Sequence, residues 1–169
     1  FYIVKKSKVY IESIPNFVFS DETKLKQVLS NIISNAIKFT PNNGKVSFDV
    51  KLLTLNENTA SVRFSVKDEG IGISPENQKS IFEPFSQADG TISRKYGGTG
   101  LGLAISLNII KMLGSEIKLI SKENEGSLFY FDLDLVVQDV SNFDSSKLKY
   151  DFAICNIIED TENIKNHLA

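Results

Sequence analysis

The sequence contains very little cysteine, histidine, methionine or tryptophan. Its 169 residues include one Cys, one His, one Met and no Trp. The single cysteine, Cys155, excludes a disulfide framework and provides no zinc cluster, so a reducing, cytoplasmic setting fits. The only histidine, His167, lies in the C-terminal tail, and we expect it to be a surface residue.

The sequence also has no large excess of positive or negative charge and no long apolar run. The formal charge is −2, so no overall basic field would attract nucleic acid, and we expect no nucleic-acid partner. The longest apolar runs are too short to span a bilayer. The chain shows no signal peptide and does not begin with Met. We therefore expect a piece of a longer protein, and an inner-membrane anchor elsewhere in that parent stays open.

The hydrophobic residues, 41% of the chain, follow regular spacings. A helix is predicted after the N-cap pair Ser20-Asp21, and it stops at Thr40-Pro41. Alternation of apolar and polar residues predicts the main strands. Weaker patterns near the N-terminus predict an edge strand at 9–11 and a short apolar run at 17–19. The expected strands cover 9–11, 17–19, 46–52, 62–66, 116–121 and 127–136, and further helices cover 75–81 and 99–113. The sum is an α+β fold, a two-layer sandwich whose mixed, mostly antiparallel sheet carries helices on one face.

One stripe of the first helix is polar and contains two asparagines. Gln27, Asn31, Asn35 and Lys38 fall beside its apolar face, although asparagine has poor helix propensity. A solvated stripe would explain this pattern. A ligand site would explain it too, because one amide oxygen from Asn35 could bind Mg²⁺ while phosphates supply the negative ligands. Lys38 could then meet a phosphate as a point charge.

Two glycine-rich segments follow. Asp68-Glu69-Gly70-Ile71-Gly72 comes directly after a strand, where glycines would admit a flat ligand and the Asp68 carboxylate could accept the exocyclic amine of adenine. Guanine presents a carbonyl there and would be repelled. A strand-ending turn with an acidic cap is the alternative.

The second glycine segment, 96–103, opens into the next helix, whose first backbone amides suit phosphate. It is neither a Walker loop nor a dinucleotide fingerprint. A flexible connector is the alternative.

Taken in order, these segments resemble the catalytic ATP-binding domain of histidine kinases, within the superfamily of gyrase, heat-shock chaperone, histidine kinase and mismatch-repair ATPases (the GHKL or Bergerat fold). The segment 21–41, with QVLSNIISNAIKFTP, resembles the N box. DEGIGI at 68–73 resembles the first glycine box, IFEPFSQAD at 81–89 the F box and GGTGLGLAI at 97–105 the second glycine box. EGSLFYFDL at 125–133 resembles the last family segment. The resemblance covers about residues 1–137 and is closest to hybrid sensor kinases.

The resemblance implies a role for each matching residue. Asn35 would bind Mg²⁺, with Asn31 and Lys38 toward the phosphates, and Asp68 would hold adenine in a pocket shaped by Gly70 and Gly72. Residues 87–98 would form a lid, from which Arg94 or Lys95 reaches phosphate. Phe82 and Phe85 would support the lid or meet a helical domain, unless they are ordinary core. The remaining nucleotide-binding residues would be Gly98, Thr99, Gly100, Leu101 and Gly102 at the phosphate end and, near adenine, Ser127.

The implied function is transfer of the γ-phosphoryl group of Mg-ATP to a histidine on a dimerisation hairpin that this chain lacks. The parent is then expected to be a homodimer, with a response regulator or receiver domain as the downstream partner. Residues 138–169 would be a linker and the possible start of a receiver-like domain, since the apolar run 152–158 precedes Glu159-Asp160.

Two alternatives stay open: an ATPase that hydrolyses ATP, and a degenerate domain without catalysis. In the related ATPases a glutamate, the general base, stands one turn before the metal-binding asparagine. Here Asn31 holds that position, which favours phosphorylation over hydrolysis.

Overall fold

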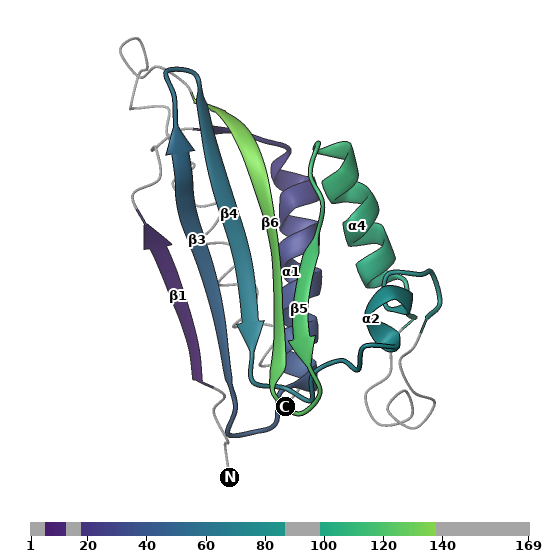
Figure 1. The fold of residues 1–169 in the computed structure, drawn as a ribbon. Helices are drawn as coiled ribbons and strands as arrows, with labels where there is room; N and C mark the ends of the chain where they lie inside the picture. The colour runs from purple at the N-terminus through teal and green to yellow at the C-terminus, as the bar shows by residue number, and fades with distance from the viewer. Residues whose placement is uncertain (1–5, 13–17, 87–98, 138–169) are drawn as a thin grey trace.

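The computed structural model describes residues 6–12, 18–86 and 99–137. Its elements follow the order predicted from the sequence (Figure 1). The strands are β1 (Lys6–Glu12), β2 (Val18–Phe19), β3 (Lys45–Leu55), β4 (Thr59–Asp68), β5 (Lys118–Lys122) and β6 (Gly126–Val137). The helices are α1 (Glu22–Phe39), α2 (Asn77–Ser80) and α4 (Gly102–Met112).

Within the described ranges the strands form one six-stranded sheet, in the order β1-β3-β4-β6-β2, with β5 also paired to β6. β1 runs parallel to β3, and the other pairs are antiparallel. Helices α1 and α4 lie on the same face of the sheet (Figure 1). The predicted α+β sandwich with a mixed, mostly antiparallel sheet is therefore confirmed.

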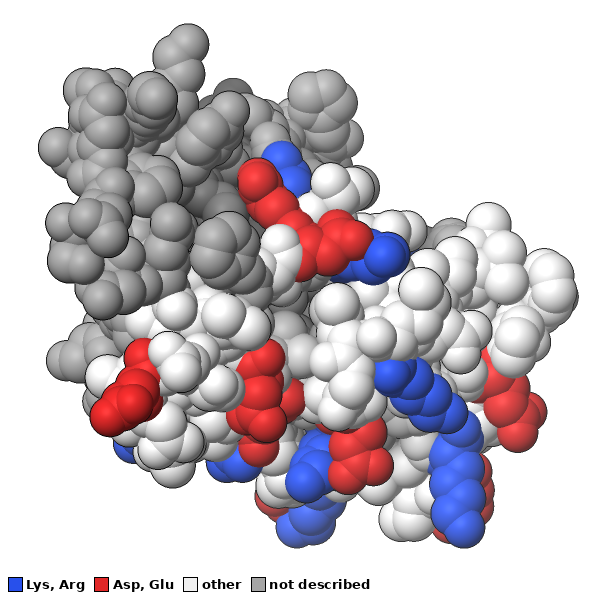
Figure 2. Space-filling model, turned by 90° about the horizontal axis from the view of Figure 1, so that it is seen from above, with Lys and Arg blue, Asp and Glu red and all other residues white. Residues whose placement is uncertain are grey.

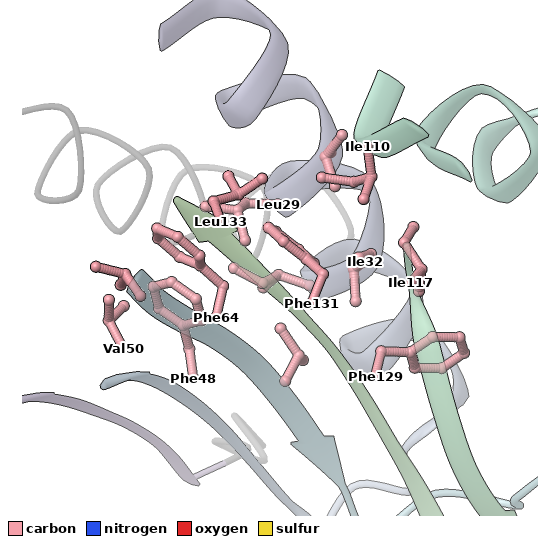
Figure 3. Packing of buried hydrophobic residues seen from close by; sticks show 14 of the residues in the cluster. Leu29, Ile32, Phe48, Val50, Phe64, Ile110, Ile117, Phe129, Phe131 and Leu133 are labelled. Atoms are coloured by element: carbon pink, nitrogen blue, oxygen red, sulfur yellow. The ribbon is translucent and has the colours of Figure 1, made fainter. Parts of the chain in front are cut away.

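The core fills the space between the sheet and these helices (Figure 3). Because side chains alternate along a strand, every second residue of the central strands points inward, and the register aligns these residues in rows. One row joins Val50, Phe64 and Phe131, and the two phenylalanine rings stack with centroids 5.3 Å apart. From the opposite layer α1 contributes Leu29 and Ile32, while α4 contributes Ile109 and Ile110.

Helix α1 has a defined beginning and end. The Asp21 carboxylate accepts a hydrogen bond of 3.0 Å from the backbone N–H of Lys24, as an N-cap should. At the other end the buried Thr40 hydroxyl donates to the carbonyl of Ala36 at 2.6 Å, and Pro41 follows. These contacts define where α1 begins and ends, whereas its buried apolar residues determine which face it turns to the sheet.

The second long helix starts later than the sequence pattern predicts. It begins at Gly102 rather than at residue 99, because Gly100 has a φ of +70° and cannot continue a right-handed helix. Strands β3 and β4 are longer than expected, since their pairing continues to the 56–59 turn, past an irregularity between Leu52 and Thr54.

The face of the sheet turned away from the helices is more polar. Arg63 of β4 donates to both carboxylate oxygens of Asp132 on β6, at 2.7 and 2.8 Å, and stacks on Tyr130. Seen from above, acidic and basic side chains are interspersed over the described surface (Figure 2). None of the helices in the described ranges is long and apolar enough to cross a membrane.

Candidate functional site

Asp68 ends strand β4 and is only 6% exposed. Its carboxylate accepts a hydrogen bond of 2.8 Å from the backbone N–H of Gly70, and it pairs across the sheet with Ser127 of β6. Burial raises the pKa of Asp68 above its ordinary value, although hydrogen bonds from the backbone of Gly70 and Ser127 oppose that rise. A carboxylate held in this way can accept further hydrogen bonds from a ligand that enters the site.

Glycines surround Asp68 because the backbone comes too close for side chains. A Cβ on Gly70 would lie 2.7 Å from the carbonyl oxygen of Phe39, at the end of α1. A Cβ on Gly72 would lie 1.9 Å from the carbonyl oxygen of Lys122, and one on Gly126 would lie 2.0 Å from that of Asp68. The loop after β4 therefore fits tightly between the end of α1 and the β5–β6 hairpin.

A serine that the sequence analysis missed joins this loop to the hairpin. The Ser121 hydroxyl accepts a hydrogen bond from the backbone N–H of Ile73 at 2.8 Å and donates to the carbonyl of Gly126 at 3.0 Å. It also lies 2.9 Å from the Ser127 hydroxyl, so Ser127 belongs to the same network as Asp68. A single serine in a strand carries no sequence signal that would distinguish it from an ordinary surface residue.

The polar stripe of α1 is partly covered rather than solvated. Asn31, Asn35 and Lys38 are half-buried, whereas Gln27 is exposed. Burial lowers the pKa of the Lys38 ammonium, which lies 4.8 Å from the centre of the Phe39 ring. Lys38 lies three residues after Asn35, so the two side chains share one face of α1.

Asn31 meets the start of α4. Its amide nitrogen donates to the Ser106 hydroxyl at 2.9 Å. Its amide oxygen would lie 2.2 Å from a Cβ on Gly102. The structure thus brings Asn31 and Gly102, two of the predicted site residues, into direct proximity.

The described residues on either side of segment 87–98 lie close together. The backbone N–H of Phe85 donates to the carbonyl of Gly100 at 3.2 Å, and Phe85 has a φ of 61° with its side chain 73% exposed. Thr99 is exposed and Leu101 is half-buried. Arg94, Lys95 and Gly98, together with the predicted lid, lie outside the described residues.

The described residues offer few metal ligands, which suits a metal ion that takes most of its ligands from a bound substrate and water. Within the described ranges, no group of three or more His, Cys, Asp or Glu residues could hold a metal ion. Asn35 offers a neutral amide oxygen on the half-buried face of α1. Mg²⁺ usually takes few protein ligands and keeps phosphate oxygens and waters, so this sparse set fits it.

A sequence model of the family described as "Histidine kinase-, DNA gyrase B-, and HSP90-like ATPase" matches residues 20–137. The chain belongs to this ATPase family. The domain is 38% identical over 122 residues to the signal transduction histidine-protein kinase BarA of Escherichia coli (strain K12). It is 43% identical over 129 residues to the sensor histidine kinase GacS of Pseudomonas protegens.

These relatives are much longer than the ATPase domain described here. The matches cover 72% and 76% of this chain but only 13% and 14% of BarA and GacS. Among solved structures, the catalytic domain of histidine kinase ThkA is 32% identical with a TM-score of 0.63, covering 78% of this chain and 81% of that one. Full-length ShkA in complex with AMPPNP is 30% identical with a TM-score of 0.67, covering 80% of this chain and 27% of ShkA.

The resemblance to the ATP-binding catalytic domain of histidine kinases is therefore confirmed at the level of family and fold. The site lies where α1, the loop after β4, the β5–β6 hairpin and the start of α4 come together.

Proposed function

We propose that this domain binds Mg-ATP and transfers the γ-phosphoryl group to a histidine of a dimerisation hairpin in its parent protein. One observation carries the proposal: α1 joins two clusters that suit the two ends of a nucleotide. Near its end, Phe39 contacts the loop of Asp68 and Gly70. Two turns earlier, Asn31 contacts Gly102 at the start of α4.

Adenine is proposed to bind at the first cluster and the phosphates at the second. Asn31 and Phe39 are about 12 Å apart along the helix axis, and Asn35 lies midway. Asp68 would accept the exocyclic amine of adenine, with Gly70 and Gly72 shaping the pocket and Ser127 beside it. The open backbone amides at the start of α4, with Gly100, Leu101 and Gly102, would face the phosphates.

The reaction depends mainly on position and charge. A histidine nitrogen attacks the γ-phosphorus, the bond to the β–γ bridging oxygen breaks, and ADP leaves with that electron pair. Mg²⁺, bound with ATP, would offset charge on the phosphate oxygens. Asn35 would hold it through the amide oxygen, Lys38 would add a positive charge, and Arg94 and Lys95 would reach the phosphates from the lid.

The partner surface is proposed to lie beside the phosphate end. Ile105 and Met112 are seven residues apart on α4, so they share one helix face, and they are 42% and 70% exposed. Phe85 and Ile105 would offer apolar side chains to a helical hairpin beside the start of α4, where the histidine must arrive. Met112 would extend this surface to the far end of the helix. Phe82, by contrast, packs edge-on against Phe129 and supports the core.

The remaining parts of the parent are also proposals. We assign residues 1–137 to the catalytic domain and residues 138–169 to a linker and the possible start of a receiver-like domain. The family match and strand β6 both end at residue 137, which supports this boundary. The relatives BarA and GacS are named as signal-transduction or sensor histidine kinases, which supports a parent that acts in signalling. We propose that this parent is a homodimer with a response regulator or receiver domain downstream, and that its catalytic domain lies in the cytoplasm.

The domain should phosphorylate the hairpin of its parent much faster than it hydrolyses ATP. A general base contributes roughly 10²–10⁴-fold, and the amide of Asn31 cannot accept the proton of water at neutral pH. Radiolabelled ATP, with and without the separately produced hairpin domain, gives both rates. A hairpin whose histidine is replaced by alanine is the control. Rapid steady-state hydrolysis by the domain alone, abolished by Asn35→Ala, would favour the hydrolysing ATPase instead.

Asn35→Ala should weaken the binding of Mg-ATP about tenfold or more, whereas Lys38→Ala should weaken it only about twofold to fivefold. The first change removes a metal ligand, and the second removes a charge that solvent partly screens. Calorimetric titration with ATP at fixed Mg²⁺ measures both effects. Gln27→Ala, an exposed position on the same stripe, is the matched control. A larger loss for Lys38→Ala at equal stability would contradict the assignment of Asn35.

A further inference from the structure

Ser106 is a polar residue buried in an otherwise apolar part of α4. It is 1% exposed, and its buried neighbours on the helix are Ala104, Ile109 and Ile110. A buried hydroxyl is costly unless it is hydrogen-bonded, and serine is a poorer helix former than alanine. Alanine would therefore suit packing and helix formation better at this position. The hydrogen bond from Asn31, at 2.9 Å, is the contact that explains a serine here.

Gly102 is explained by the same side chain. It is the first residue of α4 and does not have a positive φ, so the backbone conformation does not demand glycine. The three atoms nearest to an added Cβ are the Oδ1, Cγ and Nδ2 atoms of Asn31, at 2.2, 2.9 and 3.1 Å. Positions 102 and 106 are one helical turn apart, so both face the Asn31 amide.

We propose that Ser106 is a positioning residue for the phosphoryl-transfer reaction. Its hydroxyl holds the Asn31 amide against Gly102, and this contact sets the start of α4 at a fixed distance from the helix that carries Asn35. The phosphate-facing amides and the metal ligand then keep one arrangement before the nucleotide binds. This inference rests on the proposed function, because it assigns the phosphates to this end of α1.

A double-mutant cycle tests the inference through the affinity for Mg-ATP, with adenosine as the second probe. Ser106→Ala should weaken Mg-ATP binding about tenfold in the natural background, since the amide is no longer held. In the Asn31→Ala background the same change should have no effect. Adenosine contacts only the Asp68 end, so its affinity should be unchanged in every variant, which general damage to the fold would not allow.

Two further variants sharpen the test. Ser34→Ala is the matched control, because the Ser34 hydroxyl donates to the backbone carbonyl of Asn31 at 3.0 Å and not to its side chain. It should leave Mg-ATP affinity unchanged. Gly102→Ala should displace the Asn31 amide and weaken Mg-ATP binding, yet cost nothing more once Asn31 is alanine. If Ser106→Ala does not fold, the comparison of Gly102→Ala in the two backgrounds tests the role of the Asn31 amide instead.

The possible results separate the two proposals. If the natural domain does not bind Mg-ATP, the proposed function is wrong. If it binds Mg-ATP and Ser106→Ala binds equally well, only the role of Ser106 is overturned. A loss that persists in the Asn31→Ala background, or that extends to adenosine, would also overturn it, because Ser106 would then act through the fold and not through Asn31.

Discussion

Asp68→Asn is expected to lower the affinity for ATP at least about 100-fold while leaving the stability of the unliganded domain within about 1 kcal/mol. The asparagine carbonyl can still accept the hydrogen bond from Gly70. Its NH₂ group would then face the exocyclic amine of adenine, so two donors would oppose each other. The carbonyl of guanine would be tolerated better, and discrimination between ATP and GTP should collapse. Calorimetry with both nucleotides, together with urea unfolding, measures these effects.

The pH dependence gives this substitution a second signature. Burial raises the pKa of Asp68, so the folded domain binds its proton more tightly than the unfolded chain does. The ionised carboxylate therefore costs stability above the raised pKa, and this cost is relieved as the pH falls through it. Asp68→Asn should remove that part of the pH dependence. Adenosine binding by the natural domain should weaken over the same range, because the proton occupies the acceptor.

Asp132→Asn is the matched control for Asp68→Asn. Asp132 lies on the open face of the sheet, where its hydrogen bonds from Arg63 lower its pKa. Its contribution to stability is present above the ordinary pKa and is lost as the pH falls through the lowered one, opposite in sign to that of Asp68. ATP affinity should not change. Equal losses of ATP binding in both variants would refute the assignment of Asp68 to adenine.

Gly126→Ala is expected to destabilise the domain by about 4 kcal/mol and to abolish nucleotide binding with it. Its φ of +92° is unfavourable for alanine, and the added Cβ would lie 2.0 Å from the carbonyl oxygen of Asp68. Because that atom belongs to the backbone, β4 and β6 must separate where they hold Asp68 and Ser127. The free energy of unfolding, measured with urea, should show most of the loss.

Gly114→Ala separates the cost of a positive φ from the cost of the close contact with backbone. Gly114 lies just after the end of α4 and has a φ of +81°, close to that of Gly126, but no neighbouring atom lies within 4 Å of its added Cβ. It should therefore carry only the conformational cost, about 1–2 kcal/mol, and bind ATP normally. Similar losses at both glycines would mean that the close approach of the backbone to Gly126 is relieved at little cost.

Local patterns were sufficient to predict most of the fold. The spacing of apolar residues placed α1 and the cores of β3, β4 and β6, because a helix and a half-buried strand each impose a period on the sequence. The pairing of β2 with β6 was beyond such reasoning, since Val18 and Val137 are far apart in the chain and a two-residue strand leaves no period. The late start of α4 depends on the φ of Gly100, which the sequence allows but does not require.

The candidate site was predictable where a residue type is unusual for its position. An acid followed by two glycines after a strand, and asparagines within a helix, are such cases, and the structure gathers Asp68, Gly70 and Ser127 at one end of α1 and Asn31 and Gly102 nearer its middle. Ser106 and Ser121 were missed because serine is common in every kind of element. Their importance comes from contacts between segments far apart in the chain, which local spacing does not encode.

The seven paired residues of β1 have a practical consequence. The family match begins at residue 20, but the sheet already begins at residue 6, where β1 covers the outer edge of β3. A shortened protein that starts at the family boundary would leave the backbone N–H and C=O groups along that edge unpaired. Such an edge is a template for strands of other molecules and promotes aggregation. Strand β1 therefore belongs in any recombinant version of this domain that is meant to stay in solution.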